Sequence, residues 1–215
     1  MNDFKLFQNL STAESEKLAA SFKRCHFLRK QRVEFSGTAQ DYIYLIRSGR
    51  VKVSYLSPEG REITVTILHP GDMYSMHSEA STTVLEPAEV WYIGSEDFKK
   101  IVMQSPVLAV NLIRILGVIL KNTNDALMNL AFKEVNSRLA SLLLKMARET
   151  GAATAGGVVF EPGLTHEEMA TIISSTRQTV TTILNRFEKA GIIAVQKKRI
   201  TVINMGQLAD ISNQQ

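Results

Sequence analysis

The chain has 215 residues, of which 45% are hydrophobic and 21% are charged, as is ordinary for a globular protein with one large or two small domains. Lys and Arg outnumber Asp and Glu by 25 to 21, a mild basic excess that permits nucleic-acid binding without establishing it. A single cysteine, Cys25, excludes an internal disulfide, a four-cysteine zinc site and a cysteine-ligated iron–sulfur cluster.

No targeting or membrane-spanning segment is expected. Residues 1–5 lack the charged and apolar regions of a signal peptide. The most apolar stretch, 107–120, contains Asn111 and Arg114, and we interpret it as too short and too polar to span a bilayer. We therefore expect a cytoplasmic protein without a membrane partner.

The first half of the chain is predicted to be a short helix followed by a β-rich region. Residues 12–24 fit an amphipathic helix that is capped by Thr12 and has Leu18 and Phe22 on one face. The predicted strands are 42–47, 51–56, 62–68 and 89–93. Turn signals stand between them at 48–49, 57–60, 69–72 and 86–87. This pattern favours an antiparallel sandwich or jelly roll.

From residue 106 the apolar period becomes helical, and the predicted helix 107–131 would be roughly 37 Å long at ~1.5 Å per residue. Its residues at alternating spacings of three and four form a heptad seam: Val110, Ile113, Gly117, Leu120, Asn124, Leu127 and Ala131. Such a stripe also fits packing against the chain's own sheet. We favour a parallel homodimer seam, because a polar residue such as Asn124 sets the register of paired helices.

A second helix is predicted over 134–149, and the small residues 151–157 are interpreted as a flexible link to the last module. The long helix ends near Phe132, so the hinge between domains is expected between Phe132 and Val135.

The C-terminal module has the pattern of a helix-turn-helix. Thr165 and Glu168 form a capping box at the start of a helix that runs to Ile173. Residues 174–176 form the turn, and a second helix runs over 177–189 until Gly191 stops it. Its predicted inward face consists of Val180, Ile183, Leu184 and Phe187. Strands at 192–195 and 200–203 then surround a basic tip, as in a DNA-binding wing.

The chemistry of the second helix suits base recognition. Its N-terminal residues would meet base edges in the major groove, where Arg177 can read guanine and Gln178 can pair with adenine. The residues predicted to contact DNA are Thr165, Thr176, Arg177, Gln178, Thr179, Thr182, Lys197, Lys198 and Arg199. The alternative is a solvated helical hairpin, which would leave the agreement of cap, turn, apolar face and wing unexplained.

This layout resembles the CRP/FNR superfamily of bacterial transcription regulators. The resemblance covers essentially the whole chain and includes 48–53, 58–62, 176–180 and 183–184. It implies a non-enzymatic α+β protein with an N-terminal antiparallel β-roll, a long dimerisation helix and a C-terminal winged helix-turn-helix. We expect an effector-sensing domain over 1–105, the dimerisation helix over 106–132 and the DNA-binding domain over 133–215. The implied partners are a second copy, double-stranded DNA and RNA polymerase.

The resemblance to the superfamily does not specify which signal molecule the N-terminal domain senses. Cyclic-nucleotide members carry an arginine that pairs with the phosphate, whereas no arginine lies between Arg61 and Arg114 here. The segment 71–78 instead resembles the CooA proteins, which are haem-containing carbon monoxide sensors. The resemblance extends to 115–117, 130–133, 138–140 and 175–179.

The resemblance to CooA implies one haem b in each subunit, with His77 as the proximal iron ligand. Gly117 would leave room for the haem, and Ile113, Leu116 and Leu120 would line the pocket for carbon monoxide. The distal ligand in these proteins is the N-terminal amine of the other subunit, which here would be Met1. The implied activator binds a palindromic operator when carbon monoxide occupies the ferrous haem.

Two departures and two rivals accompany this expectation. A CooA can carry a ferric-haem cysteine where this chain has Ser75, so that ligand switch should be absent or altered. The N-terminus begins Met1-Asn2 and not with proline. One rival keeps the regulator but replaces the signal by nitric oxide, redox state or a small organic ligand. The other is a haem storage or catalytic protein, which leaves the recognition helix unexplained.

Overall fold

The computed structural model describes residues 4–35, 41–60, 62–75 and 80–214. Contacts within the chain group it into two units, Met1–Thr123 and Asn124–Gln215. The boundary between them falls inside the long helix α3 (Pro106–Phe132), so each unit holds part of that helix. The predicted three-part division at residues 105 and 132 stays a prediction.

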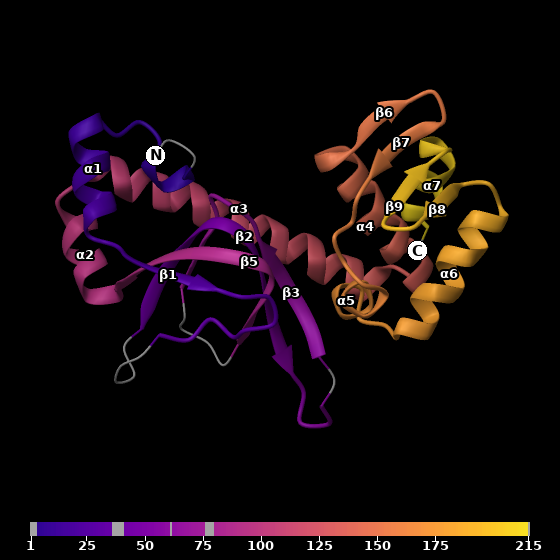
Figure 1. Cartoon of the computed structure of the whole chain (residues 1–215), viewed down its shortest axis with the longest axis horizontal. Helices are drawn as coiled ribbons and strands as arrows, with labels where there is room; N and C mark the ends of the chain where they lie inside the picture. Colours follow the sequence, from indigo (N-terminus) through magenta and orange to yellow (C-terminus); the bar gives the residue numbers. More distant parts are fainter. Residues whose placement is uncertain (1–3, 36–40, 61, 76–79, 215) are drawn as a thin grey trace. The chain divides into compact units, whose positions relative to one another are not determined.

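The N-terminal unit is built on an antiparallel sheet (Figure 1). Its elements before α3 are η1 (Lys5–Phe7), α1 (Thr12–Ala20), β1 (Lys23–Phe27), β2 (Tyr42–Leu56), β3 (Glu62–Leu68), β4 (Met73–Ser75), β5 (Ser81–Gly94) and α2 (Ser95–Met103). The strand order is β1-β5-β2-β3, with β4 paired to β2. This arrangement confirms the predicted α+β class and the antiparallel β-roll.

Several predicted boundaries in this unit are wrong. Strands 42–47 and 51–56 are a single strand, β2, because the chain at Gly49 forms a bulge instead of a turn. Gly49 has φ +77, and a Cβ there would lie 2.3 Å from the Pro87 carbonyl oxygen, so only glycine fits. Likewise, 86–87 lies within β5 and is not a turn between strands. Helix α1 is capped by Ser11 with Glu14, not by Thr12, and ends at Ala20.

The two faces of the sheet pack differently. On one face, Ile43 and Leu45 of β2 join Met73 of β4 in a core with the N-terminal segment and α3. On the other face, the alternate residues Tyr44 and Ile46 lie inside the roll. Because successive side chains point to opposite faces, Ser75 shares the face of Met73, toward the N-terminal segment and α3.

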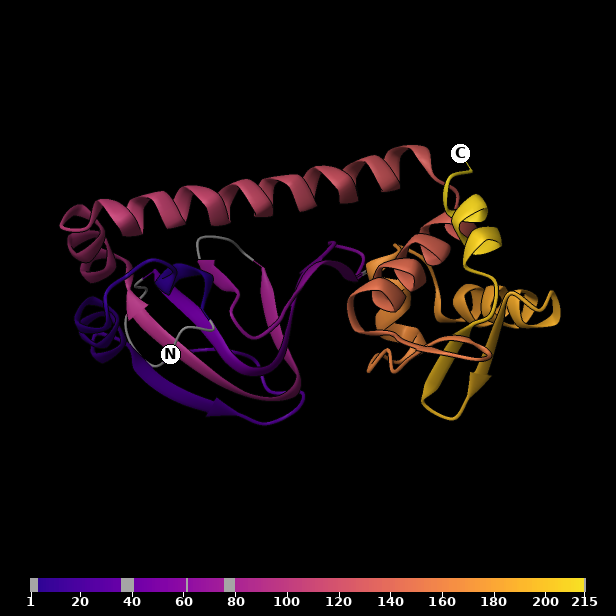
Figure 2. The same ribbon diagram turned by 90° about the horizontal axis from the view of Figure 1, so that it is seen from above.

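Helix α3 matches the predicted helix in extent but leaves most of its apolar surface uncovered. Only Leu108, Asn111 and Ile115 are buried. By length and composition α3 could span a bilayer, so the expectation that this stretch is too short and too polar is wrong. Helix α3 is one unbroken helix of 27 residues (Figure 2), and the aliphatic side chains of 107–120 outweigh Asn111, Arg114 and the polar residues that begin at Lys121. Only 17% of its most apolar window is buried, so most of this apolar stretch lies on an open face of the helix.

The C-terminal unit contains the predicted winged helix-turn-helix. After α3 come α4 (Val135–Thr150), β6 (Ala152–Thr154), β7 (Gly157–Phe160), α5 (His166–Ile172), α6 (Arg177–Lys189), β8 (Ile193–Gln196), β9 (Arg199–Val202) and α7 (Met205–Ser212). The sheet order is β6-β7-β9-β8. The predicted flexible link at 151–157 is wrong, because Ala152–Thr154 pairs with β7 as a sheet edge.

Candidate functional site

The helix-turn-helix is built by two local caps around a tight turn. Thr165 and Glu168 form the predicted capping box, in which Glu168 Oε2 accepts the Thr165 N–H at 2.6 Å. At the second helix, Thr176 Oγ1 accepts the Thr179 N–H at 3.1 Å. Between them Ser174 takes a left-handed conformation, φ 51, that reverses the chain. The hydroxyls of Thr165 and Thr176 thus hold the helix starts that were predicted to contact DNA.

The predicted inward face of α6 is confirmed, because Val180, Ile183, Leu184 and Phe187 are all buried. This packing turns the opposite face outward, where Thr176, Arg177, Gln178, Thr181 and Thr182 line an open hollow. Thr182 Oγ1 donates its proton to the Gln178 carbonyl at 3.0 Å, so its oxygen is left to act only as an acceptor. Within the described part of the chain, the Arg177 guanidinium and the Gln178 amide group have no hydrogen-bond partner. Both side chains are therefore available for an external acceptor or donor.

The wing is the β8–β9 hairpin, and Figure 1 shows it beside α6. Its tip is formed by Lys197, which has φ 55, and Lys198. Arg199 differs from these lysines, because its Nε lies 2.9 Å from Glu161 Oε1. We therefore expect Lys198 to offer a fuller positive charge to a DNA phosphate than Arg199 does.

Two substitutions separate base reading from backbone contact. Arg177→Ala is expected to cost about 1–3 kcal/mol of operator binding and to relax the preference at one base position per half-site. Lys198→Ala should weaken binding to all sequences alike and reduce its salt dependence. The measurement is binding to an operator selected from random duplexes and to its single-base variants, over a salt series. A uniform loss across sequences in both variants would contradict this division.

An arginine that the sequence analysis missed ties the predicted hinge to the helix-turn-helix. Arg138 of α4 donates through Nε to the Ile173 carbonyl and through Nη1 to the Lys133 carbonyl, both at 2.9 Å. Lys133 in turn donates to Ser141 Oγ at 3.0 Å. The break between α3 and α4 is thus bonded directly to the turn that precedes the recognition helix. The resemblance at 138–140 included Arg138 but gave it no role, because its partners are backbone carbonyls 5 and 35 residues away.

In the N-terminal unit, the segment 4–8 is fastened to α3. Asn111 is 2% exposed, and its Nδ2 donates to the carbonyls of Leu6 at 3.0 Å and Gln8 at 2.6 Å. Phe4 packs against Trp91 with ring centroids 5.2 Å apart. A buried amide that satisfies two carbonyls is a specific joint, because either carbonyl left unpaired would cost free energy.

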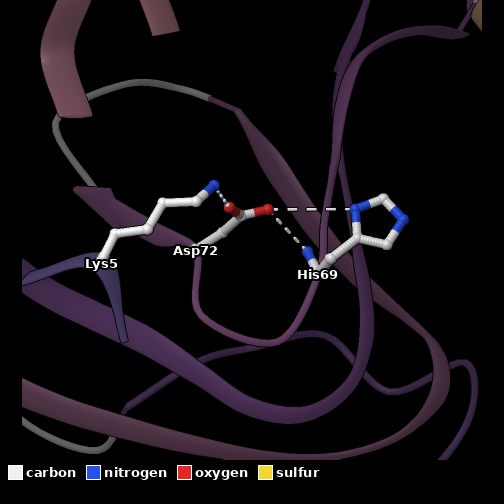
Figure 3. Close-up of polar contacts among 3 residues, drawn as sticks. All are labelled: Lys5, His69 and Asp72. Atoms are coloured by element: carbon white, nitrogen blue, oxygen red, sulfur yellow. Dashed lines mark hydrogen bonds and ion pairs between the residues drawn. The ribbon is translucent and has the colours of Figure 1, made fainter. Parts of the chain in front are cut away.

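The same segment is also bonded to the turn before β4. Figure 3 shows the Asp72 carboxylate between Lys5 and His69. Its Oδ1 lies 2.9 Å from Lys5 Nζ, and its Oδ2 accepts the His69 backbone N–H at 2.9 Å. The turn is closed further by the Asp72 N–H, which donates to the His69 carbonyl. Segment 4–8 therefore joins α3 to the turn that leads toward His77.

Asn111→Ala tests the joint between segment 4–8 and α3. We expect the free energy of unfolding to fall by about 1–3 kcal/mol, because the buried carbonyl of Leu6 and the part-buried carbonyl of Gln8 lose their donor. Limited proteolysis should also cut near residues 4–8 sooner than in the wild type. Asn122→Ala is the control, since Asn122 is exposed on the same helix and should change stability by under about 0.5 kcal/mol. Equal stabilities of the two variants would contradict the assignment.

The predicted haem residues fall into two groups. His77 and Met1 lie outside the described residues. Ile113, Leu116 and Leu120 lie on the open part of α3, where they are 69%, 57% and 62% exposed to solvent. A Cβ at Gly117 would meet no atom within 4 Å, so the backbone of α3 can be approached closely there. Ser75 carries a buried hydroxyl that has no hydrogen-bond partner among the described residues.

The interior of the roll is apolar, and the cations that border it are paired. Burial, followed by the neighbouring Tyr74, raises the pKa of the Tyr44 hydroxyl well above its ordinary value. Arg50 lies 2.8 Å from Glu86, and Lys52 lies 2.6 Å from Glu62. Burial opposes the charge of Glu62, yet hydrogen bonds from Lys52 and Ser54 outweigh it and lower the pKa of that carboxyl. A phosphate in the roll would have to compete with these carboxylates.

Comparison with known proteins matches both units to families. Residues 24–105 match the cyclic nucleotide-binding domain, and residues 137–211 match the Crp-like helix-turn-helix domain. A global nitrogen regulator from Synechococcus elongatus is 30% identical over 83% of this chain and 84% of its own length. A CRP-like cAMP-activated global transcriptional regulator from Mycobacterium tuberculosis is 29% identical over 95% of this chain and 94% of its own length. The solved structure of a CooA variant from Carboxydothermus hydrogenoformans has a TM-score of 0.85 and 29% identity, and the match covers 99% of this chain and 96% of that one.

Proposed function

The chain belongs to the CRP/FNR family of DNA-binding transcription regulators, and within that family we propose that it is a haem-dependent sensor of carbon monoxide. As a member of this family it is not an enzyme, and it combines an effector-binding domain with a DNA-binding domain. The proposal adds the signal, one haem b with its iron in each subunit, and action in the cytoplasm as an activator that works with RNA polymerase.

The observation that carries the proposal is the open apolar face of α3 around Gly117. Ile113, Leu116 and Leu120 surround this glycine on the helix and are exposed. Patches of exposed aliphatic side chains on a soluble chain mark surfaces that a partner or ligand covers. A second copy of α3 would cover part of the face through the heptad seam, and a flat apolar group would fit against the glycine.

The residues of this chain have distinct roles in the proposed effector site. His77 would hold the haem group, and Met1 of the partner subunit would offer its amine as a second ligand. Ile113, Leu116 and Leu120 form an aliphatic wall that suits a small apolar gas. When bound, ferrous haem supplies an iron that binds carbon monoxide. Among the described residues the buried hydroxyl of Ser75 has no hydrogen-bond partner, which fits a site that a further group completes, since such hydroxyls are rare in protein cores.

Segment 4–8 would couple the proposed effector site to α3. The segment follows the N-terminus directly, and Asn111 holds its carbonyls while Lys5 holds the turn before β4. A change at the N-terminus or at β4 therefore acts on α3 through bonded groups. In the DNA-competent state, two recognition helices of the dimer would meet half-sites about 34–36 Å apart. Carbon monoxide must favour that state over the resting one.

The strongest rival signal is a cyclic nucleotide, because the M. tuberculosis relative is named as cAMP-activated. Two features of this chain disfavour it. No arginine lies between Arg61 and Arg114, and the basic residues Arg50 and Lys52 face carboxylates. The M. tuberculosis relative and the solved CooA variant are both 29% identical to this chain, so the choice between signals depends on these residues and not on the degree of similarity.

An absorption spectrum of the purified protein tests the proposal directly. We expect a Soret band from about one haem per subunit, which shifts when carbon monoxide is added to the reduced protein. Operator affinity should rise on the same addition. The proposal would be overturned if the protein, after reconstitution with haem, holds clearly less than one haem per subunit and its operator affinity rises with cAMP instead of carbon monoxide.

A further inference from the structure

His166 connects the two helices of the helix-turn-helix through a side-chain hydrogen bond. It is the first residue of α5, and its Nδ1 lies 2.9 Å from Thr181 Oγ1 on α6. The Thr181 hydroxyl donates its only proton to the Arg177 carbonyl, also at 2.9 Å. With the Thr181 hydroxyl donating to that carbonyl, the tautomer of His166 that satisfies the pair carries its hydrogen on Nδ1 and donates it. This network fixes the ring, and it leaves Nε2 as the nitrogen that can meet another group.

The ring is joined to the surface that is predicted to read DNA. Thr181 and Arg177, the two residues at the other end of the network, line the same open hollow as Gln178 and Thr182. In a helix-turn-helix the second helix enters the major groove, while the first helix crosses the sugar–phosphate backbone. His166 begins that first helix and is only half-buried. Its free nitrogen is therefore suited to the backbone and not to a base.

The charged groups near His166 do not prevent an anion from binding to its imidazole. On its own helix the charged groups are Glu167 and Glu168, and the Glu168 carboxylate is occupied by the Thr165 N–H at 2.6 Å. On α6, Arg177 lies one turn before Thr181, whereas Arg186, Glu188 and Lys189 lie at the far end. In the part of the chain that the structure describes, His166 has no ion-pair partner. A DNA phosphate would supply one and would stand beside Arg177 as well.

We propose that His166 binds a phosphate of the DNA backbone through Nε2 and that Thr181 positions its ring for this contact. The contact needs a hydrogen on Nε2, and the network already places one on Nδ1, so the bound imidazole is the doubly protonated cation. DNA binding then takes up a proton at each His166. By linkage, the bound state holds that proton more tightly, so affinity rises as the pH falls through the imidazole range and the gain is lost at higher pH.

The test measures binding of the full chain to a random-sequence duplex of about 30 base pairs, at about 50 mM salt, because phosphate contacts do not depend on sequence. Between about pH 8 and about pH 6, the wild type should gain roughly tenfold more affinity than His166→Gln. His166→Arg carries a permanent charge, so it should bind tightly at both pH values. At low pH, His166→Gln should also reduce the salt slope by about 1 for each lost contact.

Matched variants separate contact from structure. His69→Gln removes an exposed imidazole of the N-terminal unit and should keep the wild-type pH response. Thr181→Val, which keeps the shape but not the hydroxyl, should weaken the response, and Thr181→Ser should retain it. Thermal unfolding of each variant at both pH values corrects for any loss of folding. The proposal would be overturned if the DNA affinity of His166→Gln responds to pH as strongly as that of the wild type. It would also be overturned if His166→Arg binds DNA tightly at low pH but not at high pH.

Discussion

Leu120→Asp is expected to convert the protein from a dimer to a monomer and to abolish specific DNA binding. Leu120 is 62% exposed on α3, in line with Ile113 and Leu127 of the predicted seam. Its replacement removes no contact of the N-terminal core, so each chain should fold as before. In a parallel dimer, however, two aspartates would face each other in an apolar seam, at a cost of several kcal/mol. A palindromic operator requires both recognition helices, so its affinity should fall together with the dimer.

The measurement is light scattering with size-exclusion chromatography, followed by operator binding on the same samples. Asn122→Asp is the matched control, because it adds the same charge to an exposed position of α3 outside the heptad seam. It should remain dimeric and keep its operator affinity. If Leu120→Asp stays dimeric at micromolar concentration, the interface lies elsewhere, and the open face of α3 needs another partner.

His77→Ala is expected to lose haem and, with it, the response of DNA affinity to carbon monoxide. The proposal makes His77 the only ligand that the β-roll supplies, so alanine leaves the iron without its proximal imidazole. The variant should still fold and form a dimer, because the seam on α3 is untouched. The readouts are the ferrous absorption spectrum, the haem content per subunit, and operator binding with and without carbon monoxide under reducing conditions.

His69→Ala is the control for this experiment. His69 lies in the turn before β4, and its imidazole is exposed, with Nδ1 3.9 Å from Asp72. Its backbone N–H makes the turn contact to Asp72, and alanine keeps that group. This variant should retain both haem and the response. If His77→Ala keeps an unchanged ferrous spectrum and still gains affinity with carbon monoxide, the haem-ligand assignment is wrong and the regulator senses by another route.

The recognition module was predicted most accurately because its signals are local. The Thr165 capping box, the turn at Ser174 and the apolar face of α6 each depend on residues within a few positions of one another. Helix α6 accordingly begins and ends where the pattern placed it. The same holds for α3, whose period of three and four specifies a helix and one apolar stripe regardless of what covers it. Family membership follows from this order of elements together with its motifs.

The tertiary structure decided what depends on residues far apart in the sequence. A glycine beside serine signalled a turn, yet Gly49 bends one long strand, because β5 pairs along both of its halves. Likewise, the small residues after Gly151 became a strand only through pairing with β7. Asn111 and Arg138 looked like ordinary polar helix residues, and their roles come from carbonyls that folding brings to them. Amino-acid patterns specify periods and caps, whereas strand partners, bulges and buried polar joints depend on which distant backbone groups meet.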